Sequence, residues 1–293
     1  MSKDIQIHNL KHIVENIKDG NCVFFLGAGA SFKSEAESPP LGKKLSNEIA
    51  DICKEGLDDY PPDIKNNKDN LLRTSLYYQF VAKNRKSLNK LLTEKFSKQY
   101  TPNALHDVLV NLKSKMPPNK PCIIITTNYD KIIEDEMDAK KIDYNLIYSL
   151  HDTNTEKWKI EEIDRTRFAE KPTIYKFHGC LKDPLGMIIT EHDYGYFLHD
   201  YLEQRSLKPH QIESEFSDSS FVFVGYGMED LDFRVIFQSI LTFSLDKGIT
   251  HFGVTPHISD LHKKYWQEHR KIQLIEMTAD DFGKELKKEL NIS

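Results

Sequence analysis

The stretch VFFLGAGAS, residues 23–31, runs from four apolar residues directly into a glycine-rich turn. A short continuous apolar run is typical of a strand that is buried on both faces of a parallel sheet. Glycines let the backbone approach a pyrophosphate closely, and the N–H groups of a following helix terminus add partial positive charge. The stretch predicts an α/β fold with a nucleotide loop, although an ordinary tight strand-to-helix turn would look similar. Phe32 stands where a dehydrogenase fingerprint would have its third glycine.

Three further segments repeat this arrangement, because each places polar residues or glycines directly after an apolar run. They read TTNYD at residues 126–130, FHG at 177–179 and VGYG at 224–227, and the last is followed by Glu229 and Asp230. Ligands of open α/β sheets bind outside the carboxyl ends of the strands. We therefore expect the four segments to line one nucleotide cleft.

The rest of the pattern predicts a parallel sheet flanked by helices. Between residues 56 and 120 the apolar residues follow helical spacing, which we interpret as a helical insertion. Residues 151–171 are polar and charged, and we expect a loop or an irregular excursion there. Helical spacing also precedes the first strand and follows Leu231 and Ser259. The predicted strands lie at residues 23–26, 122–126, 173–177, 221–224, 249–254 and 272–277.

Taken together and in this order, the four segments resemble the NAD-binding core of the sirtuin (silent information regulator type) superfamily, over residues 20–256. Within it the chain resembles bacterial antiphage-defence enzymes that hydrolyse NAD, whose asparagine loop commonly reads Thr-Thr-Asn-Tyr-Asp. The resemblance implies a Rossmann-like parallel sheet flanked by helices. We expect one domain over residues 1–293, with the helical insertion at about 56–120 and a small cleft-flanking segment at about 180–220.

Composition excludes several other classes of protein. The 293 residues are 39% hydrophobic, and the net charge of −5 with a pI near 6.2 does not indicate direct nucleic-acid binding. The N-terminal residues lack the apolar core of a secretory signal, and no stretch has the length of a membrane span. We expect a cytoplasmic protein. Its cysteines, Cys22, Cys53, Cys122 and Cys180, are isolated and imply no disulfide framework.

The cysteine spacing also bears on the type of sirtuin chemistry. Protein-deacylating sirtuins usually carry a zinc ribbon built from two Cys-x-x-Cys pairs. This chain has no such pair, and only Cys180 lies at the edge of the segment where the ribbon would be expected. No metal is therefore expected, and NAD is expected as a substrate that is cleaved without an acyl acceptor.

Asn128 and His178 are the expected catalytic residues. Cleavage of the nicotinamide–ribose bond needs little protonation of the leaving group, since the departing ring is already a cation. It passes through an oxocarbenium-like state that an aligned nucleophile must meet. Asn128 is expected to hold the attacking water and a ribose hydroxyl. The imidazole of His178 suits a general base toward a ribose hydroxyl or that water.

The residues expected to bind NAD come from the same segments and from the end of the strand at residues 249–254. For Asp130, an Asx turn that caps a helix beginning near Lys131 is an equally good interpretation. The expected ligand-binding residues are Gly27, Ala28, Gly29, Ser31, Thr127, Asp130, Gly225, Tyr226, Gly227 and Thr255.

The resemblance implies an NAD hydrolase that releases ADP-ribose and nicotinamide and depletes NAD in abortive infection. Such an enzyme needs a trigger, and the chain ends at Ser293 without room for a sensor domain. We therefore expect control in trans, by homo-oligomerisation or by a partner such as an ATPase or an Argonaute-like sensor. Two alternatives stay open: a zinc-free NAD-dependent protein deacylase or ADP-ribosyltransferase, and a non-catalytic sensor of NAD or ADP-ribose.

Overall fold

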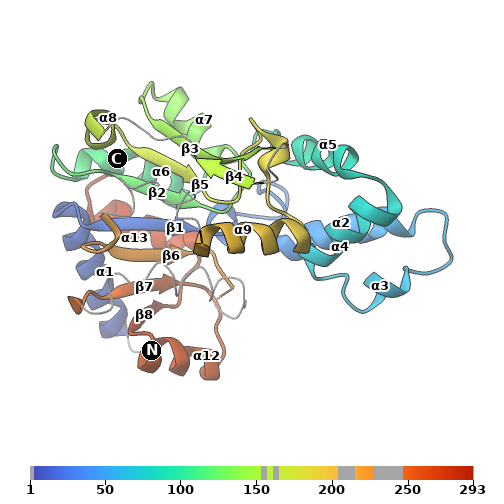
Figure 1. Ribbon diagram of the computed structural model, residues 1–293. Helices are drawn as coiled ribbons and strands as arrows, with labels where there is room; N and C mark the ends of the chain where they lie inside the picture. The colour runs from blue at the N-terminus through green and yellow to red at the C-terminus, as the bar shows by residue number, and fades with distance from the viewer. Residues whose placement is uncertain (1–2, 153–156, 161–164, 204–214, 228–246, 293) are drawn as a thin grey trace.

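The computed structural model describes residues 3–152, 157–160, 165–203, 215–227 and 247–292. Within these ranges the strands form one sheet in the order β4-β3-β5-β2-β1-β6-β7-β8, and every pair of neighbours is parallel except β3 and β4 (Figure 1). The strands are β1 Cys22–Leu26, β2 Ile123–Thr126, β3 Asn145–Asp152, β4 Lys157–Ile160, β5 Thr173–Lys176, β6 Ser220–Val224, β7 His251–Val254 and β8 Ile272–Ile275.

The first strand of the chain lies in the middle of the sheet. β1 pairs with β2 on one side and with β6 on the other, so that Leu26 is in register with both Thr126 and Val224. The chain extends the sheet on the β2 side first and on the β6 side afterwards. A reversal of this kind separates the loops at the carboxyl ends of two adjacent strands, which is where open α/β sheets bind ligands.

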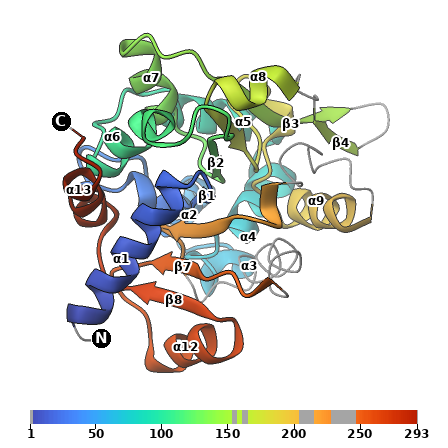
Figure 2. The same ribbon diagram turned by 90° about the vertical axis from the view of Figure 1, so that its left-hand side faces the viewer.

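Helices cover both faces of the sheet, which explains why its central strands are mostly apolar. Every residue of β1, β2, β5 and β6 is buried. Phe24 and Ile124 belong to the core of one face, whereas Phe25 and Phe223 belong to the core of the other. The helices that cover the first face are α1 (Lys3–Lys18), α6 (Ala104–Asn111), α7 (Ile132–Ala139) and α13 (Ala279–Glu289) (Figure 2). Those that cover the second face are α8 (Arg165–Glu170), α9 (Glu191–Glu203) and the π-helix η6 (Tyr265–His269), which follows α12 (Asp260–Lys264).

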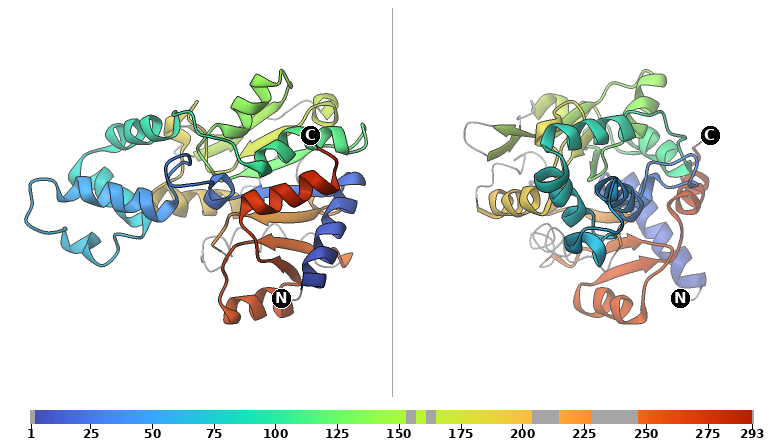
Figure 3. Two further views of the ribbon diagram at one scale, coloured as in Figure 1. Left: turned by 180° about the vertical axis from the view of Figure 1, so that it is seen from behind. Right: turned by 90° about the vertical axis from the view of Figure 1, so that its right-hand side faces the viewer.

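A further group of helices, which we call the helical module, projects away from the sheet (Figures 1 and 3). Its interior is formed by Leu45, Ile49, Leu88 and Leu92, together with Met187 from the segment between β5 and α9. α6 instead packs with α13 against the sheet, so the helices predicted between residues 56 and 120 fall into two groups. The module consists of α2 (Gly42–Lys54), α3 (Pro62–Lys65), α4 (Leu71–Tyr77), the π-helix η2 (Tyr78–Ala82) and α5 (Arg85–Phe96).

The predicted α/β fold and its six predicted strands are confirmed, whereas the prediction of a loop over residues 151–171 was wrong. That range contains the end of β3, all of β4 and all of α8. β4 is the edge strand of the described sheet and pairs antiparallel with β3, and an edge strand needs no continuous apolar run. The helix predicted from Leu231 lies outside the described residues. No helix in the described ranges combines the length and apolarity needed to cross a bilayer.

Candidate functional site

The loops that follow five parallel strands meet at one edge of the sheet. The main-chain N–H groups of Gly27, Thr127 and Phe177 each donate to the neighbouring strand, at 2.9, 3.0 and 2.8 Å. These bonds continue the sheet pairing into the loops, so the four segments singled out in the sequence lie side by side. The last residues of the strands are in register: Leu26, Thr126, Lys176, Val224 and Val254.

The glycine loop after β1 rests directly on the loop after β6. The N–H group of Gly29 donates to the carbonyl oxygen of Gly225 at 2.9 Å. A Cβ atom on Gly27 would lie 2.8 Å from the same oxygen. Gly225 has a φ of +78°, and a Cβ atom there would lie 1.9 Å from the nitrogen of Ala30. Glycine is therefore required at these positions to let the two loops touch, independently of any ligand.

The helix terminus directly behind the glycine loop belongs to a short 3-10 helix, and the long helix with Leu45 and Ile49 on its buried face starts further along the chain. The loop enters η1 (Ala28–Ser31), a four-residue 3-10 helix, and becomes extended at Phe32. The long helix α2 begins only at Gly42, after Pro39 and Pro40. Proline disfavours helical conformation in the residue before it, which delays the start of the helix. The positive end of a helix dipole at this loop is limited to that of one short turn.

Asn128 connects the loop after β2 to the glycine loop. Its Nδ2 atom donates to the carbonyl oxygen of Gly27 at 3.0 Å and to Oγ of Ser31 at 3.2 Å. Since the Gly27 oxygen only accepts hydrogen bonds, the amide has one favourable orientation. The oxygen Oδ1 of Asn128 consequently faces away from Gly27. The position of Asn128 after an apolar run predicts its place at the site but not this fixed orientation.

Asp130 also connects the loop after β2 to the glycine loop after β1. Its Oδ2 atom accepts from the hydroxyl of Ser31 at 3.0 Å, and its Oδ1 atom accepts from the N–H group of Ile132 at 3.2 Å. Both carboxylate oxygens are thus engaged within the protein, and Asp130 is buried. The second bond is the Asx turn weighed in the sequence analysis. Because the Ser31 proton goes to Asp130, a lone pair of Ser31 is left to accept from Asn128.

Lys176 is a buried cation in β5 that sequence analysis missed. Its ammonium group lies 2.9 Å from Glu134 of α7 and also donates to the main-chain oxygen of Asp130. Burial alone would lower the pKa of Lys176, but the charges of Glu134 and Asp130 outweigh it and raise the pKa above its usual value. The available signal was a single lysine in an otherwise apolar strand, which implies a buried anion nearby.

Replacement of Lys176 by methionine should destabilise the fold by about 3–5 kcal/mol, because Glu134 would remain buried without its counter-charge. Urea unfolding measures this loss. The double variant K176M/E134L should lose less than K176M alone. As a matched control, K95M breaks the ion pair of Lys95 with Glu48, whose side chains are 30% and 32% exposed, and should cost less than about 1 kcal/mol. An equal cost for the two lysines would contradict the prediction.

Thr127 and Tyr226 connect the loop after β2 to the loop after β6. The Tyr226 hydroxyl donates to the carbonyl oxygen of Leu26 at 3.1 Å and lies within hydrogen-bond distance, 2.9 Å, of the Thr127 hydroxyl. Burial raises the pKa of Tyr226 well above its usual value, so its proton stays in place at neutral pH. Both predicted binding residues thus brace the edge of the sheet.

His178 lies on the loop after β5. Thr126 and Lys176 are paired at the ends of β2 and β5, and Asn128 and His178 each follow two residues later, so they occupy equivalent positions on neighbouring loops. Its ring contacts Tyr194 edge-on, with centroids 5.8 Å apart. Within the described part of the chain, Nε2 of His178 is buried and has no hydrogen-bond partner. Burial lowers the pKa of His178 to about 3, so the imidazole is neutral at physiological pH. An unpaired buried polar atom is uncommon in proteins, and it marks Nε2 as an atom that a bound ligand can satisfy.

The helical module reaches the His178 loop through Arg85, which sequence analysis also missed. Arg85 of α5 forms an ion pair with Asp193 at 2.6 Å. Asp193 in turn accepts from the N–H group of Thr190. Ile188 lies two residues before Thr190, and its N–H group donates to the carbonyl oxygen of His178 at 3.0 Å. The module therefore supports the segment on which the histidine loop rests.

The remaining predicted binding residues differ in how far they are exposed. Ala28, the first residue of η1, and Gly227, the last described residue after β6, are exposed. Thr255 is buried, and its hydroxyl donates to the carbonyl oxygen of His257 at 3.0 Å. Glu229 and Asp230 lie outside the described residues.

More than half of the chain, residues 122–275, matches the model of the SIR2-like domain family. The chain belongs to the SIR2-like domain family. The match begins at β2, and therefore leaves out the glycine loop and the helical module. In the described ranges no three His, Cys, Asp or Glu side chains form a group that could hold a metal ion.

Several known proteins resemble this SIR2-like chain at low identity. Two are named NAD(+) hydrolase ThsA: that of Cytobacillus dafuensis is 25% identical over 83% of the chain, and that of Bacillus cereus (strain MSX-D12) is 23% identical over 79%. The chain spans 42% of the length of each. Defense-associated sirtuin 2 of Bacillus subtilis is 21% identical over 92% of the chain and 24% of its own length. A solved Sir2 homologue mutant in complex with ADP-ribose aligns with the whole chain and 99% of its own, at a TM-score of 0.49 and 14% identity.

Proposed function

We propose that this chain hydrolyses NAD at the bond between nicotinamide and ribose, and that it does so in bacterial antiphage defence. The observation that supports this most is the hydrogen bonding of the Asn128 amide to Gly27 and Ser31, because it fixes a polar side chain beside the glycine loop. Membership of the SIR2-like family and the names of the ThsA relatives favour the same reaction.

NAD is proposed to lie across the edge of the sheet where the loops meet. The glycine loop from Gly27 to Ser31 and the loop from Gly225 to Gly227 would contact the pyrophosphate and the adenosine-side ribose, with Thr127 and Thr255 beside them. This arrangement directs the nicotinamide ribose toward the loops of Asn128 and His178, which lie on adjacent strands.

Hydrolysis then follows from the fixed orientation of Asn128. Its Oδ1 atom, which faces away from Gly27, accepts a hydrogen bond from the attacking water or from a ribose hydroxyl. The water oxygen bonds to C1′ while the C1′–N bond breaks, and the electron pair leaves with nicotinamide, which becomes neutral. The proton released by the water passes to the neutral His178, so no acyl acceptor or metal ion enters this scheme.

The test is incubation of the purified chain with NAD alone, followed by product analysis. Equal amounts of ADP-ribose and nicotinamide are the expected result. Nicotinamide release only after addition of an acceptor peptide or protein would instead identify a deacylase or an ADP-ribosyltransferase. Binding of NAD without cleavage at any protein concentration would identify a sensor.

Control in trans is part of the proposal, by assembly of identical chains or by a sensor partner. A dilution series tests assembly, because turnover per chain should rise with protein concentration if an oligomer is the active form. Full turnover by a chain shown to be monomeric by light scattering would contradict this part of the proposal and leave the hydrolysis itself intact.

The low pKa of His178 predicts how activity depends on pH. Because its pKa is lowered to about 3, the imidazole remains unprotonated throughout the mildly acidic range. NAD turnover expressed as kcat/KM should therefore stay level as the pH falls from 7 to about 5, without the loss near 6.5 expected of an ordinary histidine. A fall with an apparent pKa near 6.5 would contradict the prediction.

The same shift predicts a loss of stability in acid. The folded-state pKa of about 3 lies below the unfolded value near 6.5, so the unfolded chain binds the extra proton between these pH values. The stability advantage of wild type over H178Q should be constant above pH 6.5 and shrink as the pH falls toward 3. The comparison cancels the other histidines, which both proteins share.

A further inference from the structure

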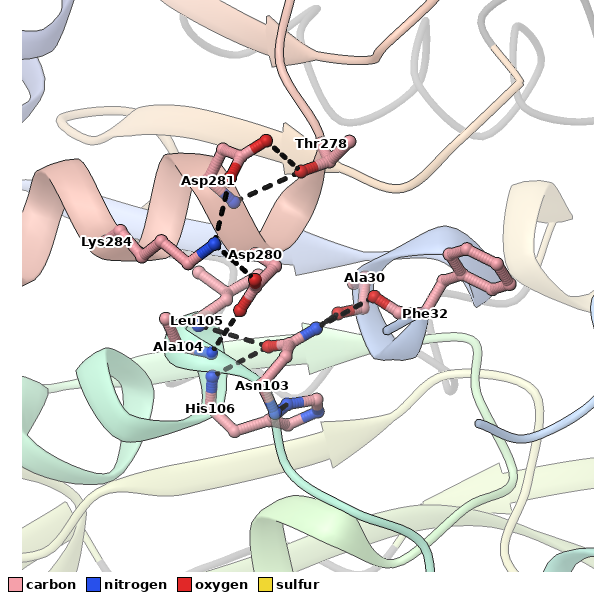
Figure 4. A network of polar contacts seen from close by, with 10 residues as sticks. All are labelled: Ala30, Phe32, Asn103, Ala104, Leu105, His106, Thr278, Asp280, Asp281 and Lys284. Carbon is pink, nitrogen blue, oxygen red and sulfur yellow. Dashed lines mark hydrogen bonds and ion pairs between the residues drawn. The ribbon is translucent and has the colours of Figure 1, made fainter. Parts of the chain in front are cut away.

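Asn103 links the glycine loop to the start of α6, which in turn is bonded to α13 (Figure 4). Its Nδ2 atom donates to the carbonyl oxygens of Ala30 and Phe32, at 2.9 and 3.2 Å. Its Oδ1 atom accepts from the N–H groups of Leu105 and His106, at 3.0 and 3.3 Å, and so caps α6. Two donors and two accepted bonds are the full capacity of an asparagine side chain. Asn103 is buried, and its bonds to Ala30, Leu105 and His106 are buried too, so these three lack competition from solvent.

Three more contacts fix the start of α6, where Asn103 lies. The N–H group of Asn103 donates to Nδ1 of His106 at 3.1 Å, which completes a capping box in which histidine takes the place of the usual glutamate or glutamine. Asp280 of α13 accepts from the N–H group of Ala104 at 2.9 Å (Figure 4). Gly283 lies so close to α6 that a Cβ atom there would be 2.2 Å from the nitrogen of Leu105. The start of α6 is thus fixed against α13.

We propose that Asn103 is a positioning residue that holds the glycine loop in the conformation that receives the dinucleotide. Without its two donors, the carbonyl groups of Ala30 and Phe32 would turn toward solvent, and η1 would lose its attachment to α6. Gly27, to which the Asn128 amide is bonded, lies one residue before η1. Asn103 therefore acts on both the binding loop and the expected catalytic amide without touching the ligand itself. The choice of ligand rests on the proposed function, whereas the anchoring does not.

The test separates the donors of Asn103 from its capping role. N103D keeps an oxygen that caps α6, but it loses both donors and sets a carboxylate against two carbonyl oxygens. N103S also retains a capping oxygen and adds no charge, and it replaces N103D if that variant does not fold. Matched controls are N70D and N84D, because Asn70 and Asn84 cap α4 and α5 in the helical module by accepting from Arg73 and Ser87.

Hydrogen–deuterium exchange of the free protein is measured first, over a peptide containing residues 27–32. In N103D or N103S this peptide should exchange roughly tenfold faster, more than the rest of the chain, while N70D and N84D leave it unchanged. The Kd for ADP-ribose should rise by roughly the same factor, and KM for NAD should rise more than kcat falls. Unchanged exchange at residues 27–32, or a rise only in step with the whole chain, would overturn the proposal. Because exchange needs no ligand, it tests the anchoring even if the chain proves not to cleave NAD.

Discussion

Alanine at position 128 is expected to lower NAD turnover by at least about a hundredfold while the protein stays folded. The Asn128 amide is the one predicted catalytic group whose orientation is fixed by two hydrogen bonds to a neighbouring loop. The substitution removes the oxygen that would hold the nucleophile and also releases Gly27. Steady-state release of nicotinamide from NAD measures the effect, with circular dichroism and urea unfolding to check the fold.

The control for this experiment is alanine at Asn145. Asn145 begins β3 at the opposite edge of the sheet, and its amide donates to the Thr173 hydroxyl at 3.2 Å. N145A removes an amide of the same size and a hydrogen bond of the same kind, so turnover should stay within about twofold of wild type. If folded N128A retained more than about a tenth of the wild-type turnover, Asn128 would not be a catalytic residue.

Alanine at Gly225 is expected to have the largest effect on stability, with a loss of more than about 4 kcal/mol or a failure to fold. The backbone there has a φ of +78°, which costs an L-residue about 1–2 kcal/mol by itself. In addition, the new Cβ atom would lie 1.9 Å from the Ala30 nitrogen, so the two loops would have to separate. The midpoint of urea unfolding measures the change.

Gly248 provides a matched control, because it separates the backbone strain from the collision. Its φ of +72° is nearly the same, but a Cβ atom on it would meet nothing within 4 Å. G248A should therefore cost only the about 1–2 kcal/mol of the left-handed conformation. Similar losses in the two variants would mean that the contact between the β1 and β6 loops is not tight.

The parts of the fold that were predictable are those in which burial alone determines the sequence. Strands such as β1 and β2 are covered on both faces, so each is a continuous apolar run that can be recognised without knowledge of its neighbours. β4 pairs with the end of β3 at the edge of the described sheet, and its Lys157 and Lys159 give it the polar pattern of a loop. Its existence depends on a partner strand that local sequence does not reveal.

The site was predictable as a set of segments but not as a set of contacts. The segments containing Asn128 and His178 could be located because each follows an apolar run. The partners that hold these loops in place are distant in sequence. Lys176 requires Glu134 from another element, and Asn103 requires the carbonyl groups of η1. A helix-capping pattern in the stretch Asn103 to His106 was available as a signal, but it indicates the start of a helix and not its attachment to the glycine loop.

The central position of β1 has a consequence for the order in which the protein assembles. β1 is synthesised early, yet Cys22 pairs with Ser220 and Gly27 bonds to Val224, which are translated much later. Contacts between residues so far apart in the chain slow folding, and until β6 arrives one edge of β1 has no strand to pair with. A nascent chain that has not yet released residues 220–225 from the ribosome therefore cannot complete the glycine loop. We expect incomplete translation products to be inactive and prone to aggregate through that open edge.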